Sequence, residues 1–143
     1  MTLTPLLVRR GLLAAVFCLL TVLARADAAT DDSLGDLITT VNVPSGLNAE
    51  TVQGTTVATL TGRTWAILRK TDDRVVGYLR HRSHETKVTL VYSAAEVKLY
   101  CVGWKIDKKT FERKKPALPE GWLENIQLDL KAKLNLAQKG VSF

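Results

Sequence analysis

Residues 86–104, TKVTLVYSAAEVKLYCVGW, decide the fold expected for this chain. In residues 86–93 and again in residues 96–104, apolar side chains alternate with polar ones, which is typical of strands with one buried face. Residues 74–82 alternate in the same way, and a short apolar run over residues 65–69 precedes them. Short turns join the four segments, so the sequence predicts a four-stranded antiparallel meander.

A helix is predicted downstream of the meander. It follows Pro116 and Pro119 and stops at Gly140, with glutamates early and lysines late, and each of these features favours a helix. Its apolar stripe consists of Trp122, Leu123, Ile126, Leu130, Leu134 and Ala137. Because such a stripe fits one face of the meander, the sequence predicts a two-layer α+β domain in which Trp122 is a core residue.

Residues 48–62 are compatible with a helix or a strand. Asn48 is a good N-cap residue, and Val52 and Leu60 fit a helical spacing. The same segment holds five threonines and two glycines, which are poor helix formers and suit a strand equally well. Local propensity leaves this choice open.

The first 26 residues have the layout of a secretory signal peptide. Arg9 and Arg10 precede a thirteen-residue apolar run, and Ala24-Arg25-Ala26 places small residues where signal peptidase reads them. Thirteen residues rise only about 20 Å as a helix, less than the ~30 Å of a hydrocarbon core, so no permanent membrane anchor is expected. We expect export to the periplasm or beyond, with cleavage after Ala26 or, as the alternative, after Ala28.

The mature chain divides by charge. Residues 27–50 contain five acidic residues and no Lys or Arg, whereas residues 51–143 contain 17 basic and nine acidic residues. This difference in charge, together with the helix- and strand-breaking residues Pro44-Ser45-Gly46, favours a flexible acidic leader over a leader that lies on a basic face of the domain. The expected division is a signal peptide (1–26), an acidic leader (27–47), a single α+β domain (48–140) and a tail (141–143).

Cys101 is the cysteine that remains after the signal peptide is removed, so no internal disulfide is expected. It shares one side of its predicted strand with Val97 and Leu99. Burial is therefore the favoured interpretation, because unpaired cysteine is among the most buried residue types. Pairing between chains and thiol chemistry are the alternatives.

Residues 105–115 form a basic loop with six bases and two acids, a net charge of +4. The candidate partner-binding residues are Lys108, Lys109, Arg113, Lys114 and Lys115. Such a loop suits an anionic envelope component or an acidic protein. The alternative is that the charges only solvate a connecting loop.

Three further polar residues are candidates for structural or functional roles. His84 is placed at the tip of a hairpin, where we expect it to stabilise the turn by hydrogen bonding. His81 lies three residues earlier, but on a hairpin tip the two have no fixed common face, so no metal site is predicted. Asn125 and Asp129 lie one turn apart on the last helix and are expected to tie it to the sheet or to the loop before it.

These motifs, taken in order, resemble a family of small exported bacterial proteins, often lipoproteins, for which no activity is established. The resemblance is carried by Arg63-Thr64-Trp65, Arg82-Ser83-His84, Val88-Thr89-Leu90-Val91-Tyr92, Trp122-Leu123-Glu124-Asn125-Ile126, Asp129 and Leu130. It implies that residues 48–62 form a helix beside the last one on the same face of the sheet. Thr64 stands where members usually have glycine, and the lipid-attachment cysteine of the family is missing here. The family implies no catalytic residues.

The composition and the motifs exclude several functional classes. Three Trp, three Tyr, three Phe and 46% apolar residues exclude a disordered chain, and two cysteines exclude a disulfide scaffold. No nucleophile arrangement and no phosphate-binding loop is found, so neither an enzyme nor a cofactor site is expected. Nucleic-acid binding is disfavoured by the export signal and because no series of aromatic residues is interleaved with the bases.

The sequence therefore favours a non-catalytic periplasmic or envelope interaction module. The alternative is a small-ligand carrier with a pocket between sheet and helices. That pocket would be lined by Trp65, Tyr92 and Trp122.

The predicted signal peptide can be tested by the intact mass of the exported protein. We expect a chain that begins at Asp27 and carries no lipid. A mass that retains residues 1–26, or that includes a lipid, would overturn this prediction.

Overall fold

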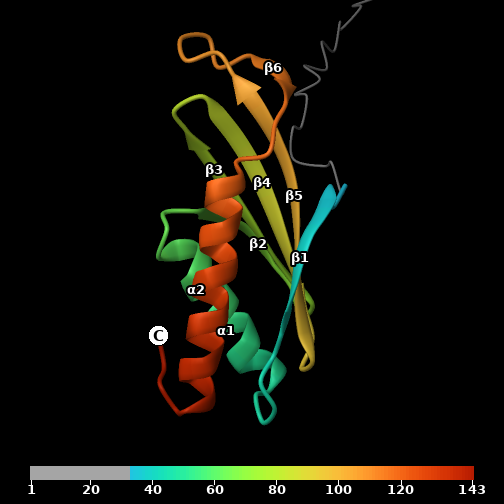
Figure 1. Ribbon diagram of the computed structural model, residues 1–143, viewed down its shortest axis with the longest axis vertical. Helices are drawn as coiled ribbons and strands as arrows, with labels where there is room; N and C mark the ends of the chain where they lie inside the picture. Colours follow the sequence, from blue (N-terminus) through green and yellow to red (C-terminus); the bar gives the residue numbers. More distant parts are fainter. Residues whose placement is uncertain (1–32) are drawn as a thin grey trace, which may run out of the picture. The chain divides into compact units, whose positions relative to one another are not determined.

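The computed structural model describes residues 33–143, so the predicted signal peptide lies outside the described residues. In chain order the elements are β1 (Asp36–Asn42), α1 (Ala49–Thr61), β2 (Ala66–Lys70), β3 (Arg74–His81), β4 (His84–Tyr92), β5 (Glu96–Ile106), β6 (Arg113–Pro116) and α2 (Glu120–Gln138) (Figure 1). The predicted α+β class is confirmed.

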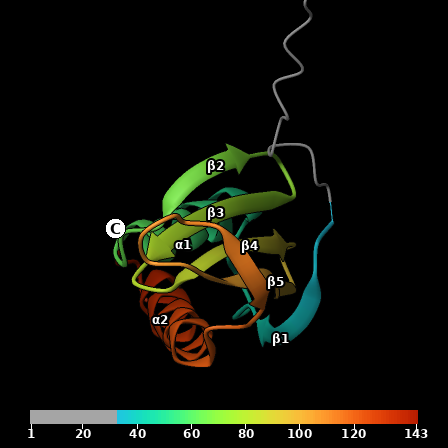
Figure 2. The ribbon, with the colours of Figure 1, turned by 90° about the horizontal axis from the view of Figure 1, so that it is seen from above.

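All the strands form one antiparallel sheet. The neighbours run in the order β1-β5-β4-β3-β2, and β6 pairs with the far end of β5. Strands β2 to β5 are the predicted meander. Viewed from above, the sheet curves, and both helices lie on one face of it (Figure 2). The predicted packing of two helices on the same face is therefore confirmed.

The predicted flexible leader is wrong for its second half. Residues 36–42 form β1, which pairs with β5 and places Val41 opposite Val97 in the core. The register shifts between Leu37 and Thr39, which breaks the alternation that would have marked a strand. Both β1 and the meander belong to a single compact unit, so the domain begins before residue 48.

Residues 49–61 form helix α1, as the resemblance implied. The Asn48 side chain caps the helix by accepting a hydrogen bond of 2.8 Å from the N–H of Thr51. The hydroxyls of Thr55, Thr56 and Thr59 each donate to the carbonyl four residues earlier, at 2.8 Å. Because these hydroxyls are satisfied within the helix, its threonine face can be buried against the sheet.

The core fills the space between the helices and the sheet. Its fully buried members include Val52 and Leu60 of α1, Ile126, Leu130 and Leu134 of α2, and Val75, Val88, Leu90, Val97 and Leu99 of the sheet. At Gly77 a side chain would not fit, because a Cβ there would lie 2.9 Å from a methyl group of Leu60. The sheet can thus approach α1 closely at this position.

Trp122 is not fully buried, which corrects the prediction that it is a core residue. It is partly buried and packs against the margin of the core, because it stands in the first turn of α2. Trp65 takes the buried position instead, with 4% of its surface exposed. The two rings meet edge to face, with centroids 6.2 Å apart.

Cys101 is buried, as predicted, with 1% of its surface exposed. Burial raises the pKa of its thiol from 9.0 to about 12, and the nearby Asp36 carboxylate adds to the effect. The thiol therefore stays protonated in the folded protein at neutral pH.

The raised pKa of Cys101 makes the stability depend on alkaline pH. Because the folded pKa of about 12 lies above the ordinary 9.0, the native state binds the thiol proton more tightly than the unfolded chain does. The stabilisation that comes from this tighter proton binding is present below pH 9 and is lost as the pH rises toward 12. Between pH 8 and pH 10, the unfolding free energy should fall by about 1 kcal/mol more in the parent than in Cys101→Ala. If urea denaturation shows the same change in unfolding free energy between pH 8 and pH 10 for the parent and for Cys101→Ala, the prediction is wrong.

Candidate functional site

The predicted basic loop, residues 105–115, includes the end of β5 and most of β6, so only residues 107–112 connect the two strands, at one end of the sheet (Figure 1). The carboxylate of Asp107 holds the loop in shape by accepting hydrogen bonds from the backbone N–H groups of Lys109 (2.8 Å) and Thr110 (3.1 Å). The same carboxylate forms an ion pair with the ammonium group of Lys114, at 2.9 Å. These contacts, with the Lys114 hydrogen bond the strongest, hold the pKa of Asp107 well below its usual range. The loop is therefore ordered around a permanent negative charge.

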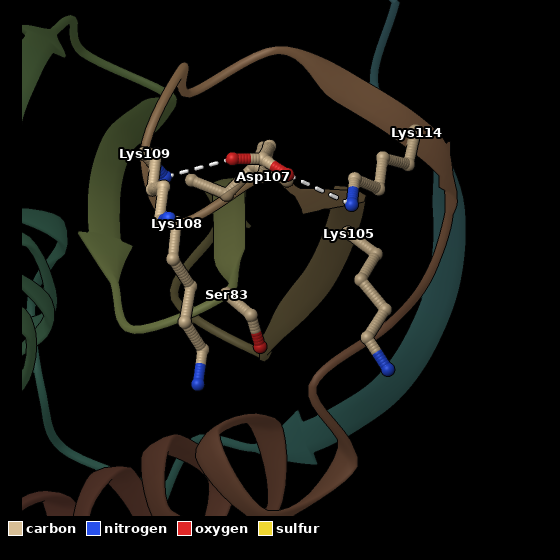
Figure 3. A pocket seen from close by; sticks show the side chains of 7 residues that line it. Ser83, Lys105, Asp107, Lys108, Lys109 and Lys114 are labelled. Atoms are coloured by element: carbon tan, nitrogen blue, oxygen red, sulfur yellow. Dashed lines mark hydrogen bonds and ion pairs between the residues drawn. The ribbon is translucent and has the colours of Figure 1, made fainter.

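A cavity of about 570 Å³ lies beside this loop, and we call it the lysine pocket (Figure 3). Its lining residues are Ser83, Lys105, Ile106, Asp107, Lys108, Lys109 and Lys114. The hairpin tip joins it because the N–H of Ile106 donates to the carbonyl of Ser83, at 2.8 Å. The side chains of Ser83, Lys105 and Lys108 extend to the same side, away from Asp107 (Figure 3). One hydroxyl and two ammonium groups thus face a common space.

The structure divides the five loop residues singled out from the sequence. Lys108, Lys109 and Lys114 line the lysine pocket, whereas Arg113 and Lys115 do not. Sequence reasoning did not select Ser83 as a site residue, because it comes from a hairpin more than 20 residues earlier. Only the pairing of β4 with β5 brings it beside the loop.

Arg113 has a structural role on the other side of the loop. Its guanidinium binds the carboxylate of Glu85, with Nε 3.0 Å from Oε1, and lies over the ring of Trp104. Arg80 binds the other oxygen of the same carboxylate at 3.1 Å. Glu85 is buried, with 7% of its surface exposed. A buried carboxylate between two arginines therefore fixes β6, and with it the base of the loop, to the sheet.

A second cavity, of about 550 Å³, lies where the end of α1 meets β3 and α2, and we call it the tryptophan cavity. Its lining residues are Gly62, Arg63, Thr64, Trp65, Leu79, His81, Trp122, Asn125 and Asp129. Thr64 has a φ of +63°, in the left-handed region that a β-branched residue rarely adopts. Backbone strain of this kind tends to accumulate at ligand-binding positions.

Asp129 and Asn125 play different parts in this cavity. Asp129 forms a two-point ion pair with Arg63, in which Nη2 lies 3.1 Å from Oδ1, and this lowers the pKa of the carboxyl. It thus ties α2 to the end of α1, and not to the sheet or the preceding loop as expected. Asn125 lines the same cavity, and its expected role as a tie stays a prediction.

His84 stands opposite His81 where β3 and β4 meet at the hairpin turn, and the hydrogen-bonding role expected of its side chain stays a prediction. Its ring packs edge to face against Trp122, with centroids 5.8 Å apart, and His81 lies 6.0 Å from the same ring. In the described part of the chain, no three His, Cys, Asp or Glu side chains come together in a way that could hold a metal ion.

The role of Glu85 can be tested by removing its charge. Glu85→Gln leaves two arginines without their counter-charge, so the unfolding free energy should fall by about 1–2 kcal/mol. Amide exchange of residues 107–113 should become faster, because the base of the loop is released. Glu96→Gln is the matched control: it removes an ion pair with Lys98 in which both side chains are exposed, so the denaturation midpoint should hardly move. Equal effects of the two substitutions would contradict this role.

Comparisons of the chain with protein-family models, curated proteins and solved structures give no match. The family resemblance drawn from the motifs therefore stays a prediction.

Proposed function

We propose that this protein is a non-catalytic, exported envelope module that docks an anionic partner through the lysine pocket. The observation that carries the proposal is the arrangement of four lysines and a serine hydroxyl around a cavity that contains one carboxylate. Ammonium groups are compact positive charges, and they bind phosphate and carboxylate groups well. The lining thus favours an anion.

The charges of the pocket are available for a partner. Lys114 is engaged by Asp107, but Lys105, Lys108 and Lys109 have no acidic partner within residues 33–143. An uncompensated cluster of this kind attracts anions over about one Debye length, ~10 Å at 0.1 M salt. It therefore favours fast, salt-dependent association.

The loop is also ordered before any partner binds. Asp107 holds the turn through two backbone amides and Lys114, and Glu85 holds the base of the loop through Arg113. A surface that is already ordered loses less conformational freedom on binding than a flexible lysine-rich segment would. This order distinguishes the pocket from a merely solvated connector.

The docking function can be tested with a labelled polyglutamate peptide as the anionic probe. In Lys105→Gln/Lys108→Gln/Lys109→Gln, binding at low salt should weaken by roughly tenfold or more, and its salt dependence should become shallower. The control removes the same charge from α2 and its C-cap residue, as Lys131→Gln/Lys133→Gln/Lys139→Gln, and should weaken binding far less. If both variants bind equally well, net charge and not the pocket governs association, and the proposal fails.

The tryptophan cavity favours a second function, that of a small-ligand carrier. A cavity of about 550 Å³ suits a small molecule, and its lining includes the amide of Asn125 and the side chains of Trp65 and Trp122. Tyr92, expected from the sequence to line the pocket, is engaged elsewhere: its hydroxyl donates to the carbonyl of Thr71 at 2.6 Å. A ligand with a flat apolar part and a hydrogen-bonding group fits this lining.

Native mass spectrometry of protein purified from the exported fraction tests the carrier function. We expect a non-covalent small molecule on the parent and on Asn135→Leu, an exposed position of the same helix. The Asn125→Leu variant should lose most of the bound small molecule, because a leucine cannot replace the hydrogen bonds of the amide. A parent protein that carries no small molecule would contradict this second function.

A further inference from the structure

We propose that the anionic partner of the lysine pocket is a membrane surface of anionic phospholipid, and that Phe111 enters the headgroup region when the loop docks. The inference rests on the docking function proposed above and names its partner. It depends on three features: the charge at one end of the molecule, the exposure of Phe111, and the shape of the loop that carries both.

The lysine pocket belongs to a larger basic end of the molecule, formed by residues 80–85 and 105–115. These segments contain eight basic and three acidic residues, a net charge of +5. Their strands pair from His84 opposite Lys105, so the hairpin tip with the exposed Arg82 lies next to the loop. Figure 1 shows both at one end of the sheet, far from the C-terminus. A flat anionic surface can therefore approach the hairpin tip and the loop together.

Phe111 stands in the middle of this basic end with 52% of its surface exposed. It is not part of the hydrophobic core cluster, and its ring lies 5.4 Å from the guanidinium of Arg80. Lysines and an arginine flank it in sequence on both sides. An exposed phenylalanine among basic residues is typical of proteins that bind the surface of an anionic bilayer.

The loop holds Phe111 in place. Its N–H donates to the carbonyl of Asp107 at 3.0 Å, and its φ of +59° turns the chain back toward β6. A φ in this region is unfavourable for phenylalanine, whereas asparagine or glycine adopts it readily. One part of the ring lies over the guanidinium of Arg80, and 52% of its surface stays exposed. We assign this exposed part of the ring to an external contact.

A lipid surface satisfies both features better than a soluble anion does. Phosphate headgroups can accept hydrogen bonds from the Ser83 hydroxyl and from the ammonium groups of Lys105 and Lys108, which extend to one side of the pocket (Figure 3). The acyl region just below the headgroups takes the apolar ring, while the long lysine stems keep their charges at headgroup level. A free phosphate would use the lysines and leave Phe111 in water. No helix within residues 33–143 is long and apolar enough to cross a bilayer, so the contact proposed here is peripheral.

Co-sedimentation of the exported protein with vesicles tests the inference. At 0.1 M salt we expect binding to vesicles of equal parts phosphatidylglycerol and phosphatidylcholine, and little binding to pure phosphatidylcholine. The triple lysine-to-glutamine variant of the pocket should bind about 100-fold more weakly, because each of the three lysines near an anionic surface contributes about fivefold. No binding to the anionic vesicles would overturn the inference.

The contribution of Phe111 is tested separately. Phe111→Asn keeps the backbone conformation of the turn, and it should lower binding to the anionic vesicles by roughly tenfold. Phe143→Asn is the matched control, because Phe143 is similarly exposed (55%) but lies at the C-terminus, and it should have little effect. If Phe111→Asn binds as tightly as the parent, Phe111 does not enter the membrane and that part of the inference is wrong.

Two soluble probes separate this inference from the docking function. If polyglutamate binds the parent and depends on the pocket lysines but the vesicles do not bind, the lipid assignment is wrong and the docking function stands. If neither binds, both are wrong. Glycerol 3-phosphate is the second probe: if it binds at micromolar concentration and Phe111→Asn leaves that binding unchanged, the pocket takes a free phosphate ester, and the membrane assignment is overturned.

Discussion

The buried carboxylate of Glu85 is the group on which the basic end of this molecule depends. It forms ion pairs with both Arg80 and Arg113, and through Arg113 it fixes the short strand β6 beside the end of β5. Without it, a segment with six bases would have little reason to stay close to a hairpin that carries Arg80 and Arg82. One buried negative charge therefore allows many positive charges to be gathered at one place.

Much of the fold could be predicted from the sequence, because β2 to β5 and α2 have regular apolar periodicity. The two elements that could not be predicted depend on interactions that periodicity does not reveal. Strand β1 is specified by its partner β5, some 60 residues away, and its own alternation is broken by a register shift. The threonine hydroxyls of helix α1 donate hydrogen bonds to the helix's own backbone, which allows them to be buried. Threonines therefore occupy positions at which an amphipathic helix usually has apolar residues.

The candidate site was predictable only in part. The lysines of the loop are adjacent in sequence, and their charge could be recognised without a structure. Ser83 and Glu85 could not be selected, because they are ordinary polar residues of a hairpin until the register of β4 against β5 places them at the loop. Arg113 has the same charge as its neighbours, and only its contact with Glu85 shows that it supports the fold.

The hairpin between β3 and β4 has a further consequence. Its tip contributes Ser83 to the lysine pocket and His81 to the tryptophan cavity, so one four-residue turn forms part of both walls. A ligand that shifted this turn from one side would also change the wall of the cavity on the other. Thermodynamic linkage would then require that the factor by which the first ligand changes the affinity of the second equals the factor in the opposite direction. Two cavities lined by separate segments of the chain thus share one turn as part of their walls.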